Sequence, residues 1–322
     1  MRAGGLVALP TETVYGLGAN ALDAQAVRGI FDAKGRPADD PVIIHLAHAA
    51  QLERAAISNT AAARLAQAFW PGPLTLVLPK QTAVPRDVTA GLDTVGVRVP
   101  SHPVAHAILV AADVPVAAPS ANLFGRPSPT TAQHVLDDLD GRIDAIVDAG
   151  PTPVGVESTI VDVSCEPYRL LRPGGLPAEA IEAVLGIRLA VPEHREGPQV
   201  APGMLDVHYA PRTPLTLVIG PHARERLIDE VQGAVAGGQR VGVLALFEDA
   251  AALPNEARVE VVGSWTSPEG TAARLFEAVR RLDSAGLEIL FARELADPRI
   301  GLGRALADRL RRAARQIVDS RD

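Results

Sequence analysis

Short apolar runs separated by polar turns dominate the first 190 residues. These runs are rich in Val, Ile and Leu and are bounded by Gly, Pro and Asp, which predicts strands. The predicted strands are 6–10, 42–46, 74–78, 95–99, 114–118, 144–148 and 159–163. Apolar residues at helical spacing predict helices over 22–33, 48–68, 102–112 and 130–139. Because strands outnumber helices and alternate irregularly with them, this half is predicted to be a mixed, twisted α/β sheet domain.

The pattern changes near residue 190. Residues 191–214 contain five prolines and no apolar periodicity, which is typical of a tether or of a lid over a cleft. Beyond them, apolar runs alternate with helical patterns, with strands at 215–220, 240–246, 259–263 and 288–292 and helices at 222–236, at 269–284 and from 301. This order predicts a small Rossmann-like α/β domain. We therefore predict three parts: a catalytic domain over 1–190, a long linker or lid over 191–214 and a C-terminal α/β domain over 215–322.

Composition narrows the class of protein. A net charge of -7 disfavours a general nucleic-acid coat protein, although a local basic pocket remains compatible with it. With Cys165 as its single cysteine, the chain can form no internal disulfide and no cysteine-based zinc site, so we expect a cytoplasmic protein. No apolar run approaches the roughly 20 residues of a membrane helix. The first predicted strand begins almost at once, which suggests the hypothesis that the native chain starts upstream of Met1.

Several familiar motifs are missing or weak. The chain has no GxxxxGK[ST] phosphate loop, no HExxH zinc pattern and no GxSxG nucleophile pattern. Gly16, Gly18 and Ala21 satisfy GxGxxG/A, but no acidic strand end follows at the expected distance. The pair His102 and His106 lacks a partnering carboxylate pattern. We therefore expect no metal bound by protein side chains.

Polar residues gather instead at predicted strand ends and turns, where α/β proteins bind ligands. They are Thr11, Glu12, Thr13, Tyr15, Lys34, Arg36, Arg98, Ser120, Asn122, Ser158, Thr159 and Arg172. Lys34 is notable because only Lys34 and Lys80 among the 31 basic residues are lysines. Each residue alone has the simpler explanation of a turn or cap. Together, the cations and the neutral hydrogen-bonding groups predict a pocket for an anionic small molecule such as a nucleoside triphosphate.

At these residues the sequence resembles the YrdC/Sua5 family. The matching stretches are "PTETVYGLG" (10–18), "KGRPADDP" (34–41), "PSANLFGRPSPT" (119–130) and "STIVDVSCEPYRLLRPG" (158–174). The "APGM…HYAP" linker and the tail ending "GLGRALADRLRRAA" resemble the longer Sua5 type. The resemblance implies a YrdC-like domain followed by a Sua5 C-terminal domain, and it spans nearly the whole chain.

The resemblance also implies an activity: L-threonine, bicarbonate or CO2, and ATP with Mg²⁺ would give threonylcarbamoyl-AMP and pyrophosphate. The product would feed the threonylcarbamoyl modification of adenosine 37 in tRNA, through downstream transfer machinery, with a weak direct tRNA contact left open. The implied catalytic residues are Lys34, Arg36, Ser120 and Asn122. The implied threonine site is Thr13, His45, Arg98, Ser120 and Ser158. The implied ATP site is Lys34, Arg36, Asp40, Thr94, Asn122, Thr130, Arg172 and Tyr209.

Two departures from the family pattern concern charge. Asp40 stands where relatives often have a neutral or basic residue, and an acid there would repel phosphate unless Arg36 or Mg²⁺ intervenes. Leu205-Asp206-Val207 replaces a Lys-Tyr-Arg that some relatives have before HYAP. A carbamoyl-adenylating domain of hydrogenase-maturation type is disfavoured by the single cysteine. A non-catalytic RNA-binding or ribosome-maturation factor on the same fold is the alternative from another class.

Overall fold

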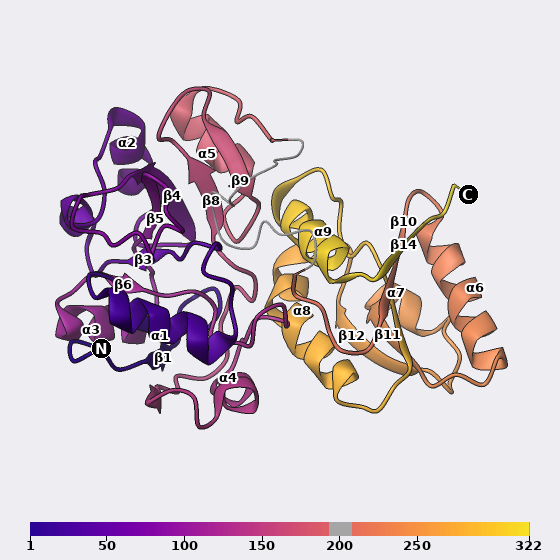
Figure 1. The fold of residues 1–322 in the computed structure, drawn as a ribbon. Coiled ribbons are helices and arrows are strands. Elements are labelled where there is room, and N and C mark those ends of the chain that lie inside the picture. The colour runs from indigo at the N-terminus through magenta and orange to yellow at the C-terminus, as the bar shows by residue number, and fades with distance from the viewer. Residues whose placement is uncertain (193–207, 322) are drawn as a thin grey trace. The chain divides into compact units, whose positions relative to one another are not determined.

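The computed structural model describes residues 1–192 and 208–321, which form two compact units (Figure 1). The first unit contains residues 1–124 and 128–192, and the second contains residues 125–127 and 208–321. Most of the predicted linker, residues 193–207, lies outside the described residues. Within the described ranges no helix is long and apolar enough to cross a membrane.

The first unit is built on a nine-stranded sheet with the order β7-β1-β2-β6-β3-β5-β4-β8-β9. The sheet contains both parallel and antiparallel pairs, for example β3 with β5 (parallel) and β4 with β5 (antiparallel). Its strands are β1 (Val7–Leu9), β2 (Gly16–Asn20), β3 (Ile44–His45), β4 (Leu74–Pro79), β5 (Thr94–Arg98), β6 (Val116–Ala117), β7 (Ala145–Ile146), β8 (Thr159–Asp162) and β9 (Arg169–Arg172). Its helices are α1 (Ala24–Lys34), the 3-10 helix η1 (Ala49–Arg54), α2 (Thr60–Phe69), α3 (Pro103–Ala112), α4 (Ala132–Leu139) and α5 (Ala178–Leu185).

The second unit is a five-stranded, all-parallel sheet with the order β12-β11-β13-β10-β14. Its strands are β10 (Leu215–Ile219), β11 (Val241–Leu246), β12 (Arg258–Gly263), β13 (Ile289–Arg293) and β14 (Gln316–Asp319). Its helices are α6 (Ala223–Ala236), α7 (Phe247–Ala250), α8 (Pro268–Asp283) and α9 (Gly301–Ala313). Figure 1 shows α6 on one face of this sheet and α8 with α9 on the other, the arrangement expected of right-handed crossovers. The α/β fold class predicted from the sequence is confirmed.

Some element predictions were wrong in detail. The sequence pattern did not predict β2, β9, α5 or β14. In β2 the sequence GLGAN has no β-branched residue, and its pairing with β1 makes it a strand. The helix predicted over 48–68 is divided into η1 and α2, because Asn59 caps α2 by accepting a hydrogen bond from the amide of Ala62 at 2.8 Å.

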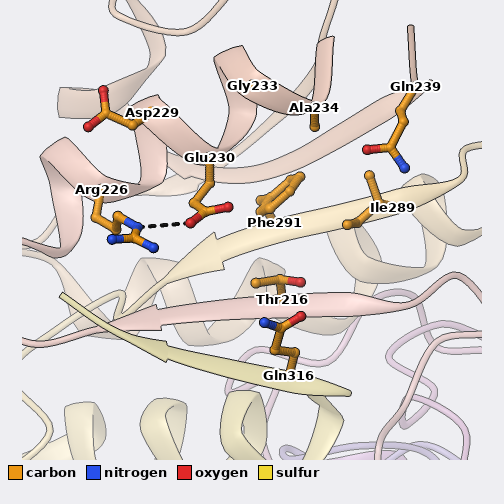
Figure 2. A pocket seen from close by; sticks show the side chains of 10 residues that line it. All are labelled: Thr216, Arg226, Asp229, Glu230, Gly233, Ala234, Gln239, Ile289, Phe291 and Gln316. Atoms are coloured by element: carbon orange, nitrogen blue, oxygen red, sulfur yellow. Dashed lines mark hydrogen bonds and ion pairs between the residues drawn. The ribbon is translucent and has the colours of Figure 1, made fainter. Parts of the chain in front are cut away.

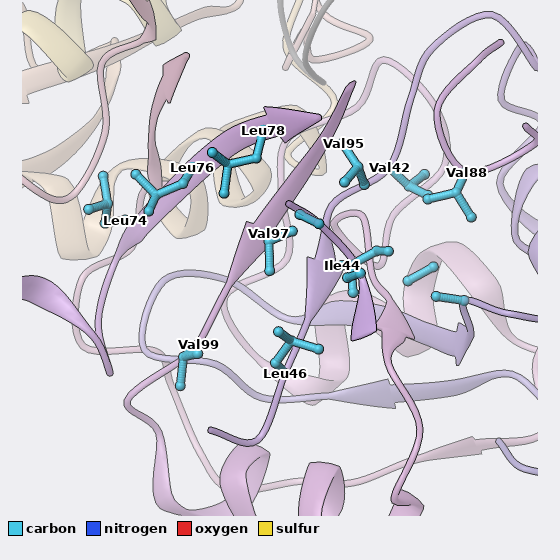
Figure 3. Packing of buried hydrophobic residues seen from close by; sticks show 14 of the residues in the cluster. Val42, Ile44, Leu46, Leu74, Leu76, Leu78, Val88, Val95, Val97 and Val99 are labelled. Atoms are coloured by element: carbon cyan, nitrogen blue, oxygen red, sulfur yellow. The ribbon is translucent and has the colours of Figure 1, made fainter. Parts of the chain in front are cut away.

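The central strands of the first sheet have two different faces. Along β3, β5 and β4, every second side chain enters the main hydrophobic core, which Figure 3 shows. The core side chains from these strands and their flanks are Val42, Ile44, Leu46, Leu74, Leu76, Leu78, Val95, Val97 and Val99. The strand register aligns them, since Val97 lies beside both Ile44 and Leu76. The residues between them must therefore project from the opposite face.

The turn that ends α1 is fixed by local sequence. Asp23 caps its N-terminus by accepting from the amides of Gln25 and Ala26. Gly35 at the C-terminus adopts the left-handed conformation with φ of 61°, and the amide of Arg36 donates to the carbonyl of Phe31. Lys34 is therefore the last helical residue, and it is buried.

Candidate active site

The face of the first sheet opposite the main core carries polar residues from neighbouring strands. His45 on β3 lies in register with Arg98 on β5. Thr75 on β4 lies in register with Ile160 on β8, and its hydroxyl is 2.8 Å from that of Ser158, just before β8. The predicted threonine-site residues His45, Arg98 and Ser158 thus lie on one face of the sheet. Side chains alternate between the two faces along a strand, so the residues between the buried apolar ones point to this opposite face.

Arg98 is the centre of a buried cluster at the end of β5. Its Nη2 lies 2.7 Å from Oε1 of Glu12, in an ion pair whose side chains are 4% and 8% exposed. Its Nη1 donates to Oγ1 of Thr13 at 2.8 Å, and its Nε donates to the carbonyl of Gly72 at 3.3 Å. Thr13 is itself held by Thr11, whose hydroxyl oxygen is 2.9 Å away. The guanidinium is therefore fixed in orientation by the turn that follows β1.

The pKa values in this cluster depend on burial and on Arg98. Burial alone would raise the pKa of the Glu12 carboxyl, but the charge of Arg98 and its hydrogen bond outweigh burial and hold that pKa below its usual range. Burial, reinforced by the positive charge of Arg98, lowers the pKa of His45 to about 3. Near neutral pH the cluster therefore contains an ionised acid, a fixed cation and an uncharged imidazole.

Lys34 organises a second cluster. Its Nζ donates to the backbone carbonyls of Ser120 at 2.5 Å and Asn122 at 2.6 Å. The carbonyl of Lys34 accepts from the amide of Phe124 at 2.9 Å. The segment 120–124 therefore wraps around a lysine that is 2% exposed. The ammonium is therefore held in place by backbone carbonyls.

Arg36 pairs with the acid that the sequence marked as a departure. Its Nη2 lies 2.9 Å from Oδ2 of Asp40, and both side chains are buried. Burial raises the pKa of the Asp40 carboxyl, while Arg36, Lys34 and Arg172 act in the opposite direction. Of these three cations, Arg36 is the one in direct contact with the carboxylate. Arg36 thus offsets the negative charge of Asp40, one of the two solutions that the sequence suggested.

Ser158 contacts residues of two neighbouring strands, Arg172 on β9 and Thr75 on β4. Arg172 donates through Nη2 to the carbonyl of Ser158 at 3.0 Å and to its hydroxyl at 3.3 Å. On its other side, the Ser158 hydroxyl meets Thr75, which stands on the strand next to Arg98. Ser158 thus connects Arg172 with Thr75, which lies on the strand next to that of Arg98.

The remaining predicted residues are more scattered. Thr94 begins β5 and lines a small pocket on the same sheet face with Pro41, Thr75 and Gly96. Thr130 is buried before α4, and its hydroxyl lies 3.3 Å from Nδ1 of His134. Tyr209 belongs to the second unit, where it packs on other residues of that unit.

Glu12 and Thr75 are site residues to which the sequence assigned no function. Glu12 was visible as a polar residue after a strand, but its pairing with Arg98 joins positions far apart in the chain. Thr75 interrupts the apolar run LTLVL at an alternate position. A hydroxyl between two core leucines of a strand, and hence on its opposite face, is the signal that could have identified it.

Two features lie apart from the site residues or are missing among the described residues: a pocket of the second unit and a cluster of metal-binding side chains. Across residues 1–192 and 208–321, no group of at least three His, Cys, Asp or Glu side chains is placed to hold a metal ion.

A pocket of about 470 Å³ lies in the second unit between α6 and the sheet (Figure 2). Its lining includes Thr216, the ion pair of Arg226 with Glu230, and Gln316, and none of the predicted site residues.

Two family models match successive parts of the chain. The model for Sua5, YciO and YrdC proteins, described as telomere recombination, matches residues 1–174. The model described as the C-terminal domain of threonylcarbamoyl-AMP synthase matches residues 176–315.

Similar proteins extend over nearly the full chain. The chain is 47% identical over 322 residues to the threonylcarbamoyl-AMP synthase of Pyrococcus abyssi, covering 98% of this chain and 92% of that protein. It is 46% identical over 320 residues to that of Bacillus subtilis, covering 98% and 90%.

Solved structures show the same fold. The crystal structure of P. abyssi Sua5 complexed with L-threonine has a TM-score of 0.90 and 45% identity, covering 99% of this chain and 93% of that one. A P. abyssi Sua5 variant, in which adjacent histidine and tyrosine residues are replaced by alanine, has a TM-score of 0.91 and 44% identity, covering 99% and 92%. The resemblance noted in the sequence is confirmed. With one family model covering more than half of its length and these relatives aligned almost from end to end, the chain belongs to the Sua5/YciO/YrdC family, in the form with a Sua5 C-terminal domain.

Proposed function

We propose that this protein is a threonylcarbamoyl-AMP synthase that uses L-threonine, bicarbonate or CO2, and ATP, and releases pyrophosphate. The observation that carries the proposal is a set of buried cations that the fold holds in place. Glu12 and Thr13 hold Arg98, the carbonyls of Ser120 and Asn122 hold Lys34, and Arg36 and Arg172 contact Asp40 and Ser158. Such cations suit two anionic reactants that must meet. The relatives of 46–47% identity with this activity support it.

The Arg98 cluster suits an amino acid. A guanidinium has five N–H donors, so Arg98 can bind a substrate carboxylate while it keeps Glu12 and Thr13. The neutral imidazole of His45 and the hydroxyl of Ser158 add uncharged hydrogen-bonding groups on the same face. Sua5 of P. abyssi was crystallised with L-threonine, which supports threonine as the amino acid for this chain.

The chemistry joins two anions. The threonine amine adds to CO2 to form a carbamate, and a carbamate oxygen then forms a bond to the α-phosphorus of ATP while the bond to pyrophosphate breaks. Holding the reactants in line can lower the barrier by roughly 7–11 kcal/mol in favourable cases. Lys34, Arg36 and Arg172 would offset charge on the phosphate oxygens. Lys34 has three ammonium donors, and the carbonyls of Ser120 and Asn122 orient two of them.

Mg²⁺ would reach this site with ATP, as part of the substrate. Asp40 is already paired with Arg36, and the described residues gather no side-chain metal site that would hold the ion independently. The product would be consumed by a tRNA-modifying transferase in the cytoplasm. The alternative of a non-catalytic RNA-binding factor gains no support from the relatives, and the net charge of -7 disfavours it.

The decisive measurement is pyrophosphate release from ATP and bicarbonate, with and without L-threonine. We expect release that depends on threonine, and threonylcarbamoyl-AMP detectable by mass spectrometry. Release that is absent, or that ignores threonine, would contradict the proposed function.

Arg98→Lys tests the threonine end of the face. Lysine keeps the positive charge beside Glu12 but loses the planar fork, so we expect the KM for threonine to rise about tenfold or more, while the KM for ATP changes little. Arg28→Lys, on the exposed surface of α1, is the matched control. Equal increases in both KM values would show that Arg98 is not specific to threonine.

Lys34→Arg tests the nucleotide end. The site around Nζ is closed by carbonyls at 2.5 and 2.6 Å, so a larger planar guanidinium would displace the 120–124 segment. We expect ATP-dependent turnover to fall by about tenfold or more. The only other lysine supplies the control, because Lys80→Arg changes a partly exposed residue outside the site. A Lys34→Arg variant as active as Lys80→Arg would refute this role.

The pKa of His45 predicts how stability depends on pH. The unfolded histidine binds a proton below about 6.5, whereas folded His45 stays neutral down to about 3, so the free energy of unfolding should decrease as the pH falls between these values. This group alone contributes up to about 1.4 kcal/mol per pH unit. Urea unfolding at pH 7, 6 and 5 should show a shallower pH dependence for His45→Gln than for His222→Gln, which changes an exposed histidine. Parallel curves for the two variants would exclude a buried neutral imidazole.

A further inference from the structure

The second unit contains a pocket of about 470 Å³ that the proposed synthase reaction does not use (Figure 2). This volume lies in the range of pockets that hold small organic molecules. The residues that line it belong to α6, to the chain just after α6, and to the strands β10, β13 and β14. All of these elements are parts of one compact unit, so that unit alone defines the pocket.

The floor of the pocket is a row of three side chains on neighbouring strands. Thr216 on β10 lies in register with Phe291 on β13 and with Gln316 on β14. Thr216 is two residues from Val218, which belongs to the hydrophobic cluster under α6, so the row points to the face of the sheet that α6 covers. Figure 2 shows the three side chains below this helix.

Small residues near the end of α6 leave the space above this floor open. Leu227 and Val231 pack the helix on the sheet, whereas Gly233 and Ala234 line the pocket. A Cβ added at Gly233 would have no neighbouring atom within 4 Å. The helix thus presents no large side chain that would fill the pocket at this point.

Several polar groups around the pocket have no partner within the part of the chain that the structure describes. Thr216 is only 6% exposed, yet its hydroxyl forms no hydrogen bond with another described residue. The side chains of Asp229, Gln239 and Gln316 likewise have no partner there. A buried hydroxyl without a hydrogen bond is costly, so the Thr216 hydroxyl points to a ligand in the pocket.

The charge around the pocket favours a cationic ligand. Its lining has two acidic side chains and one basic one, and Nε of the basic residue, Arg226, lies 2.8 Å from Oε1 of Glu230. Asp229 is therefore left without an ion-pair partner among the described residues. An ammonium group has three donors, which a carboxylate, a hydroxyl and an amide oxygen can accept together. Ile289 and Phe291 add apolar surface in the same pocket.

We propose that this pocket binds a short aliphatic amine. Asp229 pairs with the ammonium group, and the Thr216 hydroxyl and the Gln316 amide oxygen accept its remaining hydrogen bonds. The methylene groups lie along Ile289 and Phe291. The site is separate from the synthase reaction, since none of the residues predicted to bind threonine or ATP lines it.

Isothermal titration calorimetry with putrescine tests the site, and 1,4-butanediol is an uncharged probe of the same chain length. We expect putrescine to bind at one site, and butanediol to bind about tenfold more weakly or less tightly still. Asp229→Asn keeps the shape and removes the charge, so it should raise the dissociation constant for putrescine about tenfold or more. Thr216→Val should raise it about threefold. The control is Glu225→Gln, which removes an exposed acid of α6 outside the pocket and should change it by less than about twofold.

Gly233→Leu tests the pocket without removing a polar group. Leucine is a better helix former than glycine, so we expect a melting temperature at least as high as that of the wild type, together with loss of putrescine binding. The inference is overturned if the wild type binds no putrescine at millimolar concentration, or if Gly233→Leu binds it unchanged. It is also overturned if butanediol binds as tightly as putrescine. Equal weakening by Asp229→Asn and Glu225→Gln would refute it too, because that result describes a general attraction of amines to an acidic protein.

Discussion

The alternation of side chains along the central strands of the first sheet is the constraint on which the site depends. One face must be apolar to build the main core, and the strand register aligns Ile44, Leu76 and Val97 on it. The same geometry leaves His45, Thr75 and Arg98 on the opposite face. A shift of one residue in any of these strands would exchange the two faces, so the stability of the core and the integrity of the site are specified together.

Buried charge on the site face is balanced locally. Arg98 stands against Glu12 and Arg36 against Asp40, while the ammonium of Lys34 is held by backbone carbonyls. Such pairs are costly to desolvate, and their hydrogen bonds and neighbouring charges compensate for that cost. The result is a set of cations whose positions are fixed within a protein of net charge -7.

The second unit carries buried charges on one of its helices. Its parallel sheet supports α8, and the buried charged side chains of α8 contact the short segments 125–127 and 208–213. A helix that packs with one side on a sheet is a rigid support for such contacts.

The sequence by itself determined the fold class, the family and most of the residues that line the polar face, because these follow from local periodicity and from short motifs. The capping residue Asp23 and the left-handed Gly35 likewise fix the end of α1 through neighbouring residues alone. Only the tertiary structure decided which charges meet. Glu12 pairs with Arg98, and Lys34 donates to the carbonyls of Ser120 and Asn122. These partners are 86 to 88 positions apart in the chain, and local periodicity carries no information about contacts over such a separation. The tertiary structure also makes β2 a strand. Its glycine-rich sequence has no strand pattern of its own, and it pairs with the neighbouring strands β1 and β6.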